Sequence, residues 1–275
     1  MTTYKTGEYY KKVGDYFDIF AEKHHDKSDN NVILTGMRDS FRTYVTHENP
    51  ENILDIGCGP GMDVAYFASK YPAATVYGLD VSGKMVACAA ELAKSLHLNN
   101  TRFINDGIEH LHEHIGTDTR FDIIYVFFGA LNTVSSLENA AKRIDELLNP
   151  GGEAVLTFVN KYYLSEFFIH MLKLQPRKAT ARWGKIWRGY SNDYKLASKT
   201  YTPSEIKKAF NDTRLQLQKQ RGYSIFYPAW FQSGWLRKFP RVCKLLNSID
   251  KLANKTSLFW ANEEYILFVY RKNRE

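Results

Sequence analysis

The stretch Ile53-Leu54-Asp55-Ile56-Gly57-Cys58-Gly59-Pro60-Gly61 decides the fold of this chain. It begins in a short apolar run, from Asn52 to Ile56, which predicts a buried β-strand. The three glycines at alternate positions predict a tight turn whose backbone can approach a ligand closely. Residues 62–70 have helical spacing of their apolar side chains. A strand, a glycine turn and a helix in this order are typical of a nucleotide-binding α/β fold.

Strands and helices continue to alternate beyond this turn, which predicts a doubly wound, mostly parallel sheet with helices on both faces. We expect seven strands. The two late strands are expected to join the same sheet, the last one as an antiparallel edge strand. After the first strand, the expected strands cover residues 75–80, 101–105, 121–127, 153–159, 215–220 and 264–270, with helices over 83–96 and 137–148 among the connections.

The composition is that of a globular protein, with 44% hydrophobic and 24% charged residues among 275. The N-terminal residues are polar and rich in tyrosine, unlike a signal peptide. The longest strongly apolar stretch, residues 123–131, is too short to span a bilayer. Three scattered cysteines give neither a disulfide framework nor a metal-binding spacing. We therefore expect a cytoplasmic protein.

An acidic residue follows the glycine turn at the distance expected for nucleotide binding. Asp80 ends the second strand, where a carboxylate can accept hydrogen bonds from both hydroxyls of a ribose. A nicotinamide-dependent dehydrogenase is the main alternative within this fold. Its fingerprint needs the third glycine one residue later, at the position of Met62.

The glycine stretch resembles the first motif of the class I S-adenosylmethionine-dependent methyltransferases. Asp80 matches the ribose-binding acid of that family, and Asp106-Gly107 matches the position that flanks the adenine. Residues 121–124 with Leu131-Asn132 resemble its fourth motif, and residues 147–152 resemble the turn before its fifth strand. The resemblance is close over residues 50–160 and implies S-adenosylmethionine as the cofactor. It implies a cofactor site made of Asp55, Gly57, Cys58, Gly59, Gly61, Asp80, Val81, Met85, Asp106, Gly107, Ile108 and Phe127.

The resemblance implies methyl transfer by in-line displacement, in which alignment and exclusion of water are the main tasks. The stretch after the fourth strand lacks the Asn/Asp-Pro-Pro-aromatic motif of amide and exocyclic-amine methyltransferases, which favours a small-molecule acceptor, methylated at O or N. His24, His25 and Tyr16 are candidates for a catalytic base; a solvated helix end and simple packing are the alternatives. We expect no metal site, because no cluster has metal-ligand spacing.

The chain divides into an acidic first part and a basic second part. Residues 1–160 carry 14 Lys and Arg against 22 Asp and Glu, whereas residues 161–275 carry 23 against 8 and hold all five tryptophans. We expect an N-terminal helical cap over 1–48, a cofactor-binding core over 49–160, and a part over 161–275 that completes the sheet and forms a helical, aromatic lid over the acceptor site. Candidate acceptor-binding residues are Asn132, Trp183, Trp187, Tyr190 and Trp230, with packing inside the lid as the alternative.

The basic charge of the second part has two interpretations. It is either a solvated face or an attraction to an anionic partner. A basic amphipathic helix is predicted over residues 236–252. We expect a small acceptor, anionic or amphipathic; an RNA or a membrane surface stays open, an oligomer is possible, and DNA is not expected. The alternative functions are a methyltransferase that acts on a macromolecular or membrane-associated acceptor, and a cofactor-binding partner subunit without transfer activity.

Overall fold

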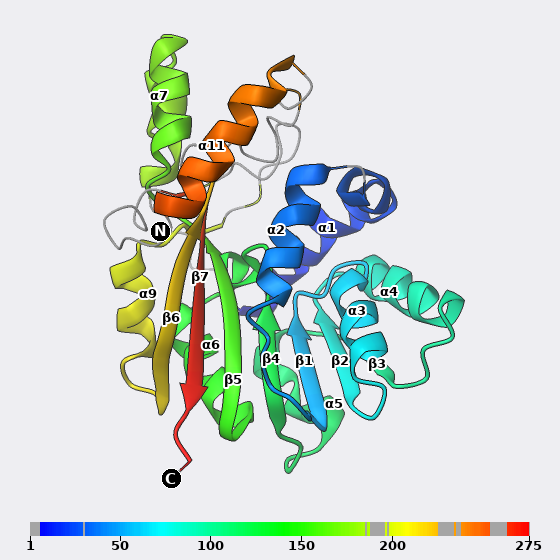
Figure 1. The fold of residues 1–275 in the computed structure, drawn as a ribbon. Coiled ribbons are helices and arrows are strands. Elements are labelled where there is room, and N and C mark those ends of the chain that lie inside the picture. Colours follow the sequence, from blue (N-terminus) through cyan, green and yellow to red (C-terminus); the bar gives the residue numbers. More distant parts are fainter. Residues whose placement is uncertain are drawn as a thin grey trace.

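The computed structural model describes residues 6–29, 31–184, 186–187, 196, 198–224, 234, 238–253 and 263–274. Side chains are described for all of these except residues 6, 20, 22–29, 251 and 253. The prediction of an α/β fold is confirmed: a sheet of seven strands, in the order β3-β2-β1-β4-β5-β7-β6, runs through the described part of the chain (Figure 1). The strands are β1 Asn52–Ile56, β2 Thr75–Asp80, β3 Thr101–Asn105, β4 Phe121–Val126, β5 Leu148–Val159, β6 Leu215–Tyr223 and β7 Tyr265–Lys272.

The last strand is antiparallel, as predicted, but its expected place at the edge is wrong. β7 lies between β5 and β6 and pairs antiparallel with both. Its residues are buried at all positions except Arg271, so a neighbour on each side satisfies its backbone without exposing apolar surface. β6 is the edge strand, and the exposed side chains of Gln216, Gln218 and Lys219 suit that position.

Helices cover both faces of the sheet. Apolar side chains of α2 (Val32–Arg42) and α3 (Met62–Lys70) pack on one face in a cluster that includes Phe41, Phe67 and Tyr125. Those of α6 (Leu137–Leu147) and α9 (Pro203–Phe210) pack on the other face in a cluster that includes Ile144 and Phe210. The elements of this core are α1 Thr6–Asp29, α2 Val32–Arg42, α3 Met62–Lys70, α4 Gly83–Ser95, η1 Ile108–His110, α5 His112–Ile115, η2 Ala130–Thr133, α6 Leu137–Leu147 and α9 Pro203–Phe210.

The connections after β5 and β6 hold further helices: α7 Leu164–Leu172, α8 Pro176–Ala179, η3 Ala181–Trp183 and α11 Pro240–Ala253. Helices α7 and α11 stand above the end of the sheet at which β5 and β6 end and β7 begins (Figure 1). The predicted basic helix begins later than expected, at Pro240, because proline fits the first turn of a helix and not its interior. Within the described residues, none of the helices has the length and apolar character needed to cross a membrane.

Candidate cofactor and acceptor site

The glycine turn leaves β1 and has a left-handed backbone that only glycine adopts without strain. Gly57 has a φ of +76° and Gly59 a φ of +52°. A Cβ atom on Gly57 would collide with the Cβ of Ala130, so the backbone of η2 approaches the turn closely there. A Cβ on Gly59 would meet nothing within 4 Å. The turn is therefore tight against the protein at Gly57 and open at Gly59.

Asp80, at the end of β2, holds this turn. Its Oδ2 accepts a hydrogen bond of 2.9 Å from the Gly59 N–H, and its Oδ1 accepts one of 2.9 Å from the Ser82 N–H. The Gly57 and Cys58 N–H groups both donate to the Leu79 carbonyl oxygen, at 2.7 and 3.0 Å. Burial raises the pKa of Asp80 above its ordinary value. The predicted ribose-binding acid thus also shapes the turn.

A cavity of about 50 Å³ lies where the ends of β1, β2 and β3 meet. That volume is room for one or two water molecules, well short of a nucleoside. The Tyr10 ring of α1 occupies the adjoining space: a Cβ on Gly107 would lie 3.0 Å from it, and the Tyr10 hydroxyl donates to Glu109 Oε1 at 2.6 Å. Predicted cofactor residues in the cavity wall are Gly57, Asp80, Val81, Asp106, Gly107 and Ile108.

The remaining predicted cofactor residues do not line this cavity, and all of them except Gly59 are buried. Cys58 is buried, which raises the pKa of its thiol and disfavours a nucleophilic role. Burial, and the Asp63 carboxylate nearby, raise the pKa of Asp55. Met85 is buried in α4, and the Phe127 ring packs 5.5 Å from the ring of Phe41, on the α2 side. Gly61 caps the start of α3 with a left-handed backbone.

Helix α1 closes one side of the cavity, through contacts that the sequence analysis missed. Asp18 Oδ1 accepts hydrogen bonds from the Ser82 hydroxyl and the Lys84 N–H, at 2.5 and 3.1 Å. A Cβ on Gly14 would lie 2.5 Å from the Val81 carbonyl oxygen, so only glycine lets α1 lie this close. A glycine within a helical aromatic pattern was the available signal. The third catalytic candidate, Tyr16, is buried in a cluster with residues 13 and 196, against which Val81 packs.

His24 and His25 lie in α1, outside the described side chains, so their candidacy as a base stays a prediction. Among the acceptor candidates, Tyr190 and Trp230 lie outside the described residues. Trp183 stacks on Phe167 with ring centroids 5.2 Å apart. Trp187 is buried, with the Arg182 guanidinium 4.8 Å from its ring centroid.

The side-chain amide of Asn132 makes its hydrogen bonds to backbone groups of this chain. Its Nδ2 donates to the carbonyl oxygens of Val159 and Lys199, at 3.1 and 2.6 Å. Its Oδ1 accepts from the Val159 N–H at 2.9 Å. Both amide hydrogens are therefore used, and Asn132 joins η2 to the end of β5 and to residue 199. This geometry gives it a structural role at the site and leaves no donor for an acceptor molecule.

Two buried carboxylates, also missed from sequence, lie at the start of β7. Glu263 is fully buried, and neither of its oxygens has a hydrogen-bond partner among the described residues. Glu264 is buried beside it; its N–H donates to the Tyr223 carbonyl and its carbonyl accepts from Asn160. Burial raises the pKa of Glu263 to about 9 and that of Glu264 to about 8. An acidic doublet in a basic part of the chain was the sequence signal.

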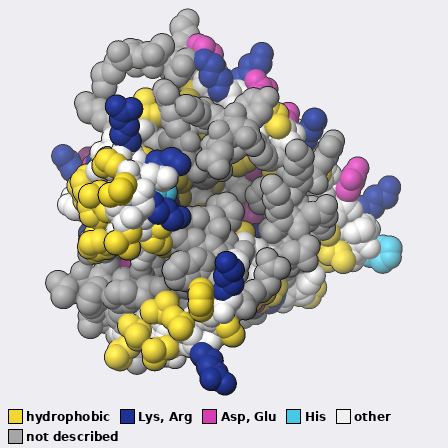
Figure 2. Space-filling model, turned by 90° about the horizontal axis from the view of Figure 1, so that it is seen from above, with side chains coloured by type: hydrophobic (Ala, Val, Ile, Leu, Met, Phe, Trp, Pro, Cys, Tyr) yellow, Lys and Arg dark blue, Asp and Glu magenta, His cyan; other side chains and the backbone are white. Residues whose placement is uncertain are grey.

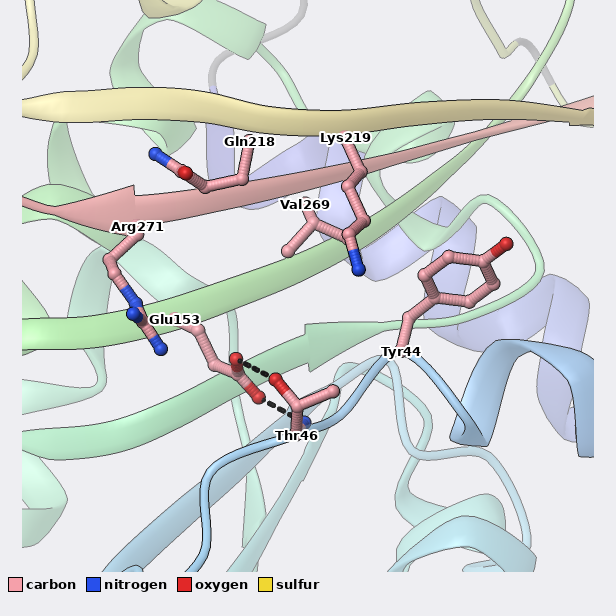
Figure 3. A pocket seen from close by; sticks show the side chains of 7 residues that line it. All are labelled: Tyr44, Thr46, Glu153, Gln218, Lys219, Val269 and Arg271. Atoms are coloured by element: carbon pink, nitrogen blue, oxygen red, sulfur yellow. Dashed lines mark hydrogen bonds between the residues drawn. The ribbon is translucent and has the colours of Figure 1, made fainter. Parts of the chain in front are cut away.

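A second cavity, of about 190 Å³, opens on the face of β5, β6 and β7 (Figure 3). Glu153 points into it and accepts hydrogen bonds from the N–H and the hydroxyl of Thr46, at 2.6 and 2.9 Å. Lys219 and Arg271 line it from the neighbouring strands. Glu153 lies in the first half of β5, whereas the glycine turn follows the carboxyl end of β1, which runs in the same direction. This cavity is therefore separate from the candidate cofactor cavity.

Comparison with known proteins identifies the family. A family model described as a methyltransferase domain matches residues 47–229. The chain belongs to this methyltransferase family. The expected class, the α/β fold and the cofactor S-adenosylmethionine are thereby confirmed.

Curated relatives match over shorter segments. A trans-aconitate 2-methyltransferase of Deinococcus radiodurans is 35% identical over 100 residues, which are 36% of this chain and 34% of the relative. An uncharacterized methyltransferase of Mycobacterium bovis is 34% identical over 112 residues, 39% of this chain and 50% of the relative. The match thus spans a third to a half of the length of these relatives.

Solved structures share the fold over nearly the whole chain. The [4+2]-cyclase SpnF has a TM-score of 0.65 at 16% identity, with 96% of each chain covered. A phosphoethanolamine N-methyltransferase of Haemonchus contortus, solved with phosphomonomethylethanolamine and S-adenosylhomocysteine, has a TM-score of 0.60 at 17% identity over 96% of this chain and 59% of that one. At these identities the likeness concerns the fold alone.

Proposed function

We propose that the protein transfers the methyl group of S-adenosylmethionine, by in-line displacement, to an oxygen or nitrogen of a small amphipathic acceptor. The observation that supports this most is the cavity at the ends of β1, β2 and β3. Residues from three separate stretches, Gly57, Asp80 and Asp106-Gly107, line it together. Ligands of doubly wound sheets bind at this end of the strands.

Each part of the site has a task in binding the cofactor. The Asp80 carboxylate would accept hydrogen bonds from the ribose hydroxyls, and Val81 and Ile108 would pack against the adenine. The open backbone at Gly59 lets the rest of the cofactor approach the turn. The bound cofactor supplies a methyl group activated on a sulfonium. The chain's remaining tasks are to align the acceptor and to exclude water.

The electrostatics of the lid side favour an amphipathic acceptor over a purely anionic one. Glu263 and Glu264 lie by the ends of β5 and β6, on the edge of the sheet that holds the cofactor cavity. Both carboxyls are buried and mostly protonated near pH 7, because their pKa values are raised to about 9 and about 8. They therefore bring no positive charge that would hold an anionic group, whereas their oxygens can accept hydrogen bonds from a hydroxyl or an amine. The apolar part of the acceptor would lie against Trp183 and Phe167, which stack on each other.

A turnover assay tests the proposal. The protein is incubated with S-adenosylmethionine and a fractionated metabolite extract, and release of S-adenosylhomocysteine is measured. Release above that of the Gly59→Leu variant, concentrated in fractions with amphipathic amines or alcohols, supports the proposal. Retained cofactor binding without release from any fraction would instead favour a partner subunit that only binds the cofactor.

A further inference from the structure

Helix α7 exposes several of its apolar side chains. None of its residues is buried, although Leu, Phe, Ile and Met make up most of it. Phe168 is 58% exposed, Leu172 85%, and Leu174, just beyond the helix, 88%. A helix of this composition is normally packed inside a protein. Single exposed apolar residues are common, but a group of this kind marks an interaction site.

Helix α11 is amphipathic but has its apolar side outward. Val242, Leu245, Ile249 and Leu252 are exposed, and their spacing of three and four residues places them along one face. The helix instead buries Cys243 and Asp250. A helix that serves only to cover a core does the reverse, because burial of the apolar stripe is what stabilises it.

Within residues 164–180 and 238–253, the exposed charges of the described side chains are all positive. Glu166, in α7, is largely buried and pairs with Arg182 at 2.5 Å, and Asp250 is buried in α11. These are the only acidic residues in 164–180 and in 238–253, so the described side chains of these two segments expose cations and no carboxylate. The exposed cations are Lys173, Arg177, Lys178, Lys238, Arg241 and Lys244.

Both helices lie above the end of the sheet at which β5 and β6 end (Figure 1). Figure 2 looks onto this face and shows hydrophobic side chains in groups with Lys and Arg side chains next to them. We call this the α7–α11 surface, made of Phe168, Leu172, Leu174, Val242, Leu245, Ile249, Leu252 and the six exposed cations.

We propose that the α7–α11 surface docks the protein on anionic lipid bilayers. Leucine, isoleucine and phenylalanine side chains enter the boundary between headgroups and acyl chains, while lysine and arginine beside them attract anionic lipids. Two other occupants fit less well. A second copy of the chain would bring like charges together. RNA is held by cations and stacking aromatic rings, whereas this surface is mainly aliphatic.

Docking does not depend on the proposed transfer reaction, since the surface shares no residue with the cofactor cavity. Docking through the α7–α11 surface would turn the end of the sheet that carries the cofactor cavity toward the bilayer. An amphipathic acceptor partitions to the same interface, so the two proposals agree while remaining separately testable.

Vesicle co-sedimentation of the full chain tests the proposal. Vesicles of phosphatidylcholine with phosphatidylglycerol are compared with phosphatidylcholine alone, at low and high salt. We expect binding to the anionic vesicles only, weakened by salt. The double variant Leu172→Ser/Leu245→Ser and the charge variant Lys173→Glu/Arg241→Glu should each lower the affinity about tenfold or more.

Leu96→Ser is the matched control, because Leu96 is an exposed leucine at the end of α4, away from this surface. It should bind vesicles as the unmodified protein does, and so should Gly59→Leu, which is designed to lose the cofactor. Thermal unfolding checks that every variant folds. Absence of binding to anionic vesicles would overturn the proposal. So would a dimer that the leucine variant abolishes, or RNA binding stronger than vesicle binding.

Discussion

The backbone N–H of Gly59 donates a 2.9 Å hydrogen bond to the carboxylate of Asp80, which joins the glycine turn after β1 to the end of β2. The same carboxylate holds the Ser82 N–H at the start of α4. One buried acid therefore shapes the glycine turn, and it is the acid that we propose to bind the ribose. The prediction of its position from sequence depended only on the order of strand, turn, helix and strand.

Removing this carboxylate should weaken cofactor binding more than it weakens the fold. For Asp80→Ala we expect a loss of about 1.5–3 kcal/mol in the binding free energy, because charge-assisted hydrogen bonds disappear. Asp80→Asn keeps one acceptor oxygen, so its affinity for the cofactor should lie between that of the unmodified protein and that of Asp80→Ala. Calorimetric titration with S-adenosylhomocysteine measures the effect. Unchanged affinity in Asp80→Ala would mean that the end of β2 is not the ribose site.

A bulky residue at Gly59 should abolish cofactor binding with only modest cost to folding. The side chain of Gly59→Leu would enter the open space above the turn, and the φ of +52° should cost about 1–2 kcal/mol in the free energy of unfolding. Gly116→Leu is the control: Gly116 also has a positive φ, +81°, and open surroundings away from the site, and its ψ of 156° makes a side chain there at least as costly to the fold. We expect Gly116→Leu to melt no higher than Gly59→Leu and still to bind the cofactor, which Gly59→Leu does not. Loss of binding in both would point to instability as the cause.

The Tyr10 ring should slow entry of the cofactor, because the cavity it borders is too small for a nucleoside. For Tyr10→Ala we expect faster association of S-adenosylmethionine in stopped-flow fluorescence. Tyr10→Phe removes only the hydroxyl that donates to Glu109 and should have a smaller effect. An association rate that Tyr10→Ala leaves unchanged, or lowers, would show that the ring does not stand in the way.

The buried acids near β7 should make the protein less stable as the pH rises. The pKa of Glu263 is raised from 4.5 to about 9, so the folded state holds a proton that the unfolded state releases. The free energy of unfolding that this proton contributes is fully present below pH 4.5. It is lost as the pH rises from 4.5 to about 9, at up to about 1.4 kcal/mol per pH unit. Glu263→Gln should raise the free energy of unfolding at pH 8 by roughly 2–4 kcal/mol and change it little at pH 5.

Glu205→Gln is the control for this effect. The Glu205 carboxylate accepts from the Thr202 N–H at 2.8 Å in the capping box of α9. Its removal should lower stability by about 0.5–1 kcal/mol at pH 8. Chemical denaturation at both pH values measures the two variants. Equal stability of Glu263→Gln and the unmodified protein at pH 8 would show that Glu263 is charged and satisfied there.

The parts of the fold and site that were predicted well from sequence are those that the order of strands, turns and helices along the chain determines. Gly57, Asp80 and Asp106 meet because the carboxyl ends of neighbouring parallel strands share one edge of the sheet. The position of β7 was predicted wrongly because pairing with β6 is non-local, although its apolar run on both faces indicated an interior strand. The contact of Tyr10 with Gly107 and the pairing of Asp18 with Ser82 depend on how α1 packs against α4 and the end of β2. Neither leaves a motif in the sequence.

The surroundings of the candidate acceptor residues were the least predictable part, because they too depend on non-local contacts. Asn132 matched a family motif, yet its amide is used up by Val159 and Lys199, which are distant in sequence. Glu263 became visible only when the fold buried it against Gly222. The exposed apolar stripe of α11 also required the structure, because the spacing alone does not say which side faces the core.

Calorimetric titration of the full chain with S-adenosylmethionine tests the central claim most directly. We predict saturable binding at one site per chain, abolished by Gly59→Leu and retained in Gly116→Leu. No heat of binding up to millimolar cofactor, in a protein that unfolds cooperatively, would contradict it.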